Sequence, residues 1–184
     1  MNTYILSDVN FGNDKLLKQN NSFRSLVMGG VTNVDDYNEM IVDNINKKLK
    51  KRDVLFLLGN LGVGFEKHIN ELRCNKMLML GNQDYISVHT LMGLNYATVI
   101  GVRRYKKHWL TPHPIHENEL WGQKNIHGGM FGVPIKDERY ISTSVEVSAG
   151  WPIPMDMILG GEFETYNIES PECAIFQVES LGIK

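Results

Sequence analysis

The chain has 184 residues, the length of one ordinary domain, and this is enough to bury a core without help from disulfides or metal. Hydrophobic residues make up 42% and charged residues 22%, which excludes a disordered, collagen-like or coiled-coil chain. The formal net charge of -2 argues against bulk electrostatic attraction to nucleic acid or to an anionic membrane. We therefore expect a single domain over residues 1–184.

The start of the sequence predicts a protein that stays in the cytoplasm. It opens directly on an apolar run, without a basic leader or a small-residue cleavage site. No window approaches the roughly 18 apolar residues that a membrane span requires. The two cysteines, Cys74 and Cys173, match no metal or redox spacing, so we expect two thiols in a reducing compartment.

The first half alternates compact apolar runs with helical patterns, which is typical of β/α units. Apolar residues recur at three- and four-residue spacing from Val34 to Leu49, so this stretch predicts an amphipathic helix with Asn33 or Thr32 as its N-cap. Shorter helices are expected at 66–72 and 86–92. Buried strands are expected at three apolar runs: Thr3–Leu6, Val54–Leu58 and Met77–Leu80.

The second half has short β-like runs separated by turns that contain Pro or Gly. Strands are expected at Ala97–Val102, His108–Leu110, Lys124–Ile126, Tyr140–Val145 and Ile175–Val178. The pair Gly160-Gly161 then begins an acidic C-terminal extension over residues 160–184. We interpret this extension as a solvated edge that closes the sheet, with an interaction element as the alternative.

Polar side chains follow the predicted strands at the points where the strands end. Asp8, Asn60 and Asn82 follow the first three strands, and His113 and His127 lie at or beyond the ends of two later ones. The carboxyl ends of parallel strands meet at one edge of a sheet. Carboxylate, carboxamide and imidazole groups gathered there are similar to a ligand set for a divalent metal.

The order of the motifs adds specificity. Ser-Asp-x-x-Phe-Gly begins at Ser7, Leu-Gly-x-Leu at Leu58, Leu-Gly-Asn-x-Asp at Leu80, Thr-x-His-Pro at Thr111 and Asn-Ile-His-Gly at Asn125. Together they resemble the calcineurin-like metallophosphoesterases, especially their compact bacterial and phage members, over residues 3 to about 158. The resemblance implies an α/β (α+β) fold, a four-layer α-β-β-α sandwich, in which two divalent metals hydrolyse phosphoesters.

The departures from the family pattern fall on its ligand and acid positions. The resemblance predicts His, bridging Asp, acid His and two ligand histidines at positions where this chain has Asn10, Asn60, Gln83, Gly129 and Phe131. Two divalent ions roughly 3.5 to 4 Å apart repel by on the order of 20 kcal/mol, which a bridging carboxylate offsets and a neutral amide does not. We therefore expect no dinuclear site and no catalytic residues.

The leading hypothesis is a pseudoenzyme that binds an unknown protein partner or self-associates, in a host cytoplasm if the gene belongs to a phage. No cofactor is expected. The remnant of the cleft would consist of eight residues: Asp8, Asn10, Asn60, Asn82, Gln83, Asp84, His113 and His127.

Two alternatives stay open. A weak phosphodiesterase or phosphatase would hold one divalent ion on Asp8, Asn82 and His113, with Asp84 or His116 recruited. A nucleotide or nucleic-acid binder would use the remnant cleft with the basic run Arg103–Lys107. For the basic runs at 47–52 and 103–107, a solvated surface is the more common role.

Simpler roles are also available to the same polar residues. Asp8 would cap the turn after the first strand, and Asn60 and Asn82 would satisfy loop amides. For His127 the default is a structural hydrogen bond. Of the six histidines, only His113 stands where the resemblance requires an imidazole ligand.

Overall fold

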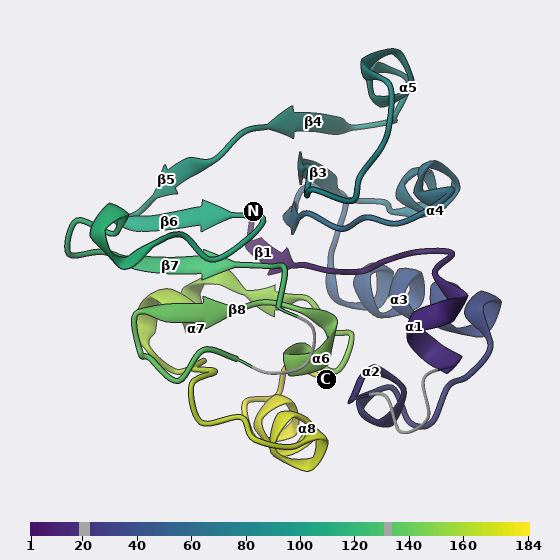
Figure 1. The fold of residues 1–184 in the computed structure, drawn as a ribbon. Helices are drawn as coiled ribbons and strands as arrows, with labels where there is room; N and C mark the ends of the chain where they lie inside the picture. Colours follow the sequence, from purple (N-terminus) through teal and green to yellow (C-terminus); the bar gives the residue numbers. More distant parts are fainter. Residues whose placement is uncertain (19–22, 131–133) are drawn as a thin grey trace.

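The computed structural model describes residues 1–18, 23–130 and 134–184. Figure 1 shows two β-sheets with helices packed around them, so the α/β class predicted from the sequence is confirmed. One residue of the predicted site, Phe131, lies outside the described residues.

The first sheet has five strands in the order β4-β3-β2-β1-β9. Strands β1 to β4 are parallel, and β9 pairs antiparallel with β1 at the opposite edge from β4. Most side chains of β1 and β2 are buried, since both strands are continuous apolar runs in the middle of the sheet. The strands are β1 (Thr3–Leu6), β2 (Val54–Leu58), β3 (Asn75–Met79), β4 (Ala97–Ile100) and β9 (Ile153–Pro154).

The second sheet has four strands in the order β5-β6-β7-β8, of which β6, β7 and β8 are parallel and β5 is antiparallel to β6. The strands are β5 (Arg103–Tyr105), β6 (His108–Thr111), β7 (Lys124–His127) and β8 (Tyr140–Ser142). A parallel bridge between Ser7 and Ser144 joins the segments that follow β1 and β8. The carboxyl ends of the two sheets therefore meet.

Figure 1 places α3 and α4 on the side of the five-stranded sheet that faces away from β6 to β8. The N-cap of α3 is Asn33, one of the two residues predicted for this role, and its side chain accepts hydrogen bonds from Asp35 N and Asp36 N. The helices are α1 (Asp14–Lys18), α2 (Phe23–Val27), α3 (Val34–Lys48), α4 (Phe65–Glu71), α5 (Val88–Met92), α6 (Val145–Ser148), α7 (Met155–Gly160) and α8 (Pro171–Ser180), with a short 3-10 helix η1 (Glu117–Glu119).

Two strand predictions in the second half are wrong. The stretch Ile175–Val178 is part of helix α8, which begins at the N-cap Ser170 and has Pro171 in its first turn. Its buried residues Ala174 and Val178 are four apart, which is helical spacing. The other prediction, Tyr140–Val145, is too long, because β8 ends at Ser142 and Val145 begins α6.

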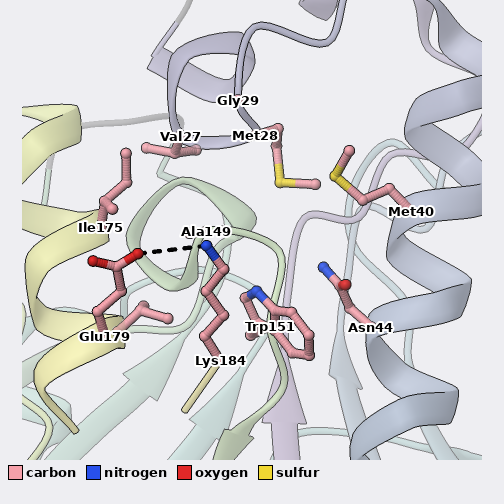
Figure 2. A pocket seen from close by; sticks show the side chains of 11 residues that line it. Val27, Met28, Gly29, Met40, Asn44, Ala149, Trp151, Ile175, Glu179 and Lys184 are labelled. Atoms are coloured by element: carbon pink, nitrogen blue, oxygen red, sulfur yellow. Dashed lines mark hydrogen bonds and ion pairs between the residues drawn. The ribbon is translucent and has the colours of Figure 1, made fainter. Parts of the chain in front are cut away.

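The acidic C-terminal segment does not close a sheet. Helix α8 packs against α2 and α6, and residues Phe163 and Ile183 on either side of it are fully buried. Figure 2 shows a pocket of about 300 Å³ between α2, α3 and α8, lined mainly by apolar side chains that include Met28, Met40 and Trp151. The segment is thus anchored in the core of the domain.

In residues 1–18, 23–130 and 134–184, no helix is both long enough and apolar enough to cross a bilayer.

Candidate functional site

The turns after β1 and β2 place three polar residues in left-handed backbone conformations. The φ angles are 56° at Asp8, 46° at Asn10 and 50° at Asn60. Asn and Asp tolerate this region better than other residues with a Cβ atom. The two turns run side by side, because Asn10 N donates to Asn60 O at 2.8 Å. Backbone geometry is therefore one reason for the Asp and Asn residues at these strand ends.

The carboxylate of Asp8 is fully buried and surrounded by donors. Its Oδ1 accepts hydrogen bonds from Asn60 Nδ2 at 2.6 Å and from Gly129 N at 3.0 Å. Its Oδ2 accepts from Gly129 N at 2.9 Å and from Ser7 Oγ at 3.0 Å. Asn10 Nδ2 does not contact the carboxylate, because it donates to the backbone carbonyl oxygen of Asp8 at 3.0 Å. Both oxygens of the carboxylate are thus engaged by the protein itself.

The Gly128-Gly129 pair allows the loop after β7 to reach Asp8. A Cβ atom at Gly129, whose φ is 81°, would lie 2.1 Å from His113 Nδ1, and one at Gly128 would lie 2.4 Å from Leu58 O. Neither position has room for a side chain. The glycine at 129 thus has a role of its own, because its backbone N–H donates to both carboxylate oxygens of Asp8.

His113 and Asn82 lie together, but not as a pair of ligands. Asn82 N donates to His113 Nε2 at 3.4 Å, and the side chain of Asn82 is exposed. The neighbouring Gln83 is also exposed. The turns after β3 and β6 therefore lie together, while the hydrogen bonds of the Asp8 carboxylate within the described residues go to Ser7, Asn60 and Gly129 and not to His113 or Asn82.

The residues expected to support a metal have structural contacts instead. Asp84 Oδ1 accepts from Leu61 N at 2.6 Å and Asp84 Oδ2 accepts from Gly81 N at 2.7 Å, so this carboxylate ties the turns after β2 and β3 together. His116 lies before η1, where its Nδ1 accepts from Asn118 N at 3.2 Å.

His127 is fully buried at the end of β7. Its Nδ1 lies 2.9 Å from Gly128 O, which is the structural hydrogen bond expected from the sequence. Its Nε2 has no hydrogen-bond partner among the described residues. Burial lowers the pKa of His127 to about 4, with a further lowering contribution from His113. The ring is therefore neutral near pH 7, and Nδ1 carries the proton that Gly128 O accepts.

A buried ion pair near Asp8 was not predicted from the sequence. Arg24 Nε donates to Glu146 Oε1 at 2.8 Å, and both side chains are only 3% exposed. Tyr37 connects this pair to the site, since Tyr37 OH lies 3.4 Å from Arg24 Nη1 and donates to Val9 O at 2.6 Å. Arg24 and Glu146 are 122 positions apart, so no local spacing could have revealed their contact.

Asp8 is harder to ionise than an ordinary aspartate. Burial raises its pKa from 3.8 to about 6, and the negative charge of Glu146 adds to the effect. The hydrogen bonds from Asn60 and Gly129, and the charge of Arg24, act in the opposite direction but do not cancel it. Near neutral pH, keeping the Asp8 carboxylate ionised in this buried position therefore lowers the stability of the folded state.

These residues do not fit the two metals implied by the family resemblance. The donors around Asp8 are N–H and O–H groups, whose positive ends face the carboxylate, and Asn60 turns its amide nitrogen toward it. Within residues 1–18, 23–130 and 134–184, no group of three or more His, Cys, Asp or Glu side chains is arranged to hold a metal ion. We therefore derive no metal-dependent chemistry for this arrangement.

We expect Asp8→Asn to change how stability depends on pH. The raised pKa of Asp8 makes the folded state more stable as pH falls through about 6, whereas the lowered pKa of His127 makes it less stable as pH falls from 6.5 to about 4. The two effects oppose each other in the wild type, each being worth about 3 kcal/mol. The variant keeps only the His127 effect.

Urea unfolding of both proteins between pH 7 and pH 4 tests this prediction. The free energy of unfolding of Asp8→Asn, relative to the wild type, should fall by about 2.4 kcal/mol across this range, most of the full effect. All other titrating groups are common to both proteins and cancel in the difference. A difference that does not change with pH would contradict the prediction.

Comparison with known proteins supports the fold alone. No family model matches the sequence, and no curated protein matches it. A solved structure described as that of the protein of unknown function AQ665 from Aquifex aeolicus is similar, with a TM-score of 0.62 and 19% sequence identity. The similarity covers 86% of this chain and 98% of that one. At this identity the shared architecture carries no statement about activity.

Proposed function

We propose that this protein is a catalytically inactive relative of the calcineurin-like metallophosphoesterases, built on their four-layer sandwich, that acts by binding a protein partner or a second copy of itself. The observation that carries the proposal is the state of Asp8. Its two oxygens accept hydrogen bonds from Asn60, Gly129 and Ser7 in a fully buried position, where an active relative would present ligands to metal.

A role in binding is supported by exposed apolar side chains around the edge strand β4. Four large apolar residues within or close in sequence to β4 are exposed: Tyr85, Met92, Val99 and Val102. Strand β4 has one neighbour, β3, in the described sheet. An edge strand with exposed apolar residues is a common place for association with another chain.

Metal content and hydrolysis together test the loss of activity. We expect substoichiometric manganese, zinc and iron in protein purified without chelator. We also expect no turnover of a chromogenic phosphodiester with added Mn, Ni, Mg or Zn. Two tightly bound ions per chain would overturn the proposal.

His113→Ala is the control for residual activity, with His116→Ala as the matched variant outside the cleft. Hydrolysis that His113→Ala abolishes and His116→Ala leaves intact would establish a mononuclear enzyme and overturn the proposal. Hydrolysis that survives both variants is assigned to a contaminant only if it separates from this protein on gel filtration, and it overturns the proposal if it does not. Sedimentation analysis then separates self-association from binding to another protein.

A further inference from the structure

A second pocket lies at the amino ends of the strands of the five-stranded sheet, whereas Asp8 lies at their carboxyl ends. Its lining comes from the segments that precede β2, β3 and β4, so it opens at the amino ends of these strands. Its volume is about 570 Å³, within the range of pockets that hold small molecules. The residues with chemical importance are Lys50, Lys51, Glu71, Arg73 and Tyr96.

The charge of this pocket suits an anion. Three of its lining residues are cationic, Lys50, Lys51 and Arg73, and one is acidic, Glu71. Lys51 and Arg73 have no ion-pair partner in the described parts of the chain, and Glu71 faces His68 at 3.8 Å. The pocket therefore has a local excess of positive charge in a chain of net charge -2, and this charge favours an anion.

Tyr96 adds an aromatic surface at the same place. Its side chain is 66% exposed, and its backbone has the strained φ of 52°. The buried Lys76 lies beneath it, with Nζ 5.9 Å from the centre of the ring. Tyr96 O also accepts a hydrogen bond from Lys76 N at 2.9 Å. Lys76 thus contacts Tyr96 from the buried side, while most of Tyr96 stays exposed to solvent.

Hydrogen bonds fix the loops that carry these groups. Asn46 Oδ1 accepts from Arg73 N at 3.0 Å, and Asn70 Oδ1 accepts from Asn95 N at 3.0 Å. Lys76 Nζ donates to Leu72 O at 2.9 Å and so fastens the end of α4 to β3. The pocket is therefore prepared before a ligand arrives, which lowers the entropy cost of binding.

We propose that this pocket binds a nucleotide. Lys51 and Arg73 contact the phosphate, and the base stacks on Tyr96. A ligand that is only a phosphate would not contact the exposed ring of Tyr96. A ligand that is only an apolar ring would not contact the cationic residues. The ligand is either a free nucleotide or one nucleotide of a single-stranded nucleic acid, since both present the same base and phosphate. The proposal does not depend on the state of Asp8 or on the loss of hydrolytic activity.

Calorimetric titration at low salt tests the proposal with AMP, ADP and a short oligouridine, and with adenosine and inorganic phosphate as partial ligands. We expect a nucleotide or the oligonucleotide to bind more tightly than either partial ligand. Tyr96→Ala should weaken binding about 5- to 100-fold, while Tyr96→Phe retains it. The double variant Lys51→Gln/Arg73→Gln should weaken it at least as much, with a smaller salt dependence.

Lys67→Gln is the matched charge control, because Lys67 is exposed on α4 and does not line the pocket. Tighter binding of the oligonucleotide than of ADP assigns the site to a single strand, and the reverse assigns it to a free nucleotide. Absence of binding to every probe overturns the proposal. So does equal weakening by Lys67→Gln, or weakening by His113→Ala without any effect of Tyr96→Ala.

Discussion

Glu146→Gln is expected to lower the free energy of unfolding by about 3–5 kcal/mol, because it leaves the guanidinium of Arg24 buried without a counter-charge. Both side chains of this pair are 3% exposed, so water cannot take the place of the lost carboxylate. For a chain of this size the midpoint of thermal unfolding should fall by roughly 6–20 °C. The two atoms of closest approach, Arg24 Nη2 and Glu146 Oε1, are 2.7 Å apart.

Urea unfolding near pH 7 measures this effect, and Lys136→Gln is the control. The ion pair of Lys136 with Glu169 is as short, at 2.7 Å, but its side chains are 72% and 67% exposed. Loss of an exposed pair should cost less than about 1 kcal/mol. The double variant Arg24→Met/Glu146→Leu should recover most of the stability, because it removes both charges together. Similar costs for Glu146→Gln and Lys136→Gln would contradict this account.

Gly129→Ala is expected to destabilise the protein by about 2–5 kcal/mol, through backbone strain and overpacking together. The new Cβ would lie 2.1 Å from His113 Nδ1 and 2.9 Å from Pro112 O, at a φ of 81°. A histidine at the same position, which the proposed relationship to the metallophosphoesterases would call for, should cost at least as much. One substitution therefore cannot return a ligand imidazole to this loop.

Gly122→Ala separates the two contributions. Gly122 has a φ of 73° but no atom within 4 Å of an added Cβ, so its replacement carries the backbone cost alone. We expect a loss of about 1–2 kcal/mol for Gly122→Ala. Equal losses in the two variants, measured by urea unfolding, would show that the loop moves away from His113 at no cost.

The parts of the fold that could be predicted are those specified by local patterns. Strands Thr3–Leu6 and Val54–Leu58 and the Asn33 N-cap are confirmed, since a buried apolar run and a capping side chain act within a few residues. The strand prediction at Ile175–Val178 is wrong, because four residues do not distinguish a strand from one turn of a buried helix. The cap Ser170 and the following Pro171 were the available signal.

The candidate site was predictable in its position and not in its contacts. Parallel strands bring Asp8 and Asn60 together whatever their roles, so their proximity followed from the strand order. The Asp8 carboxylate accepts a hydrogen bond from Gly129 N, and the charges of Arg24 and Glu146 affect its pKa. These are tertiary contacts, and the spacing of residues along the chain carries no information about them.

The long separations of these contacts also determine when the site forms. Asp8 meets Gly129 across 121 positions and Arg24 meets Glu146 across 122, so both contacts require closure of most of the chain. Closing such long loops costs entropy and slows folding. During synthesis, Asp8 cannot accept from Gly129, and Arg24 cannot pair with Glu146, until these later residues have left the ribosome.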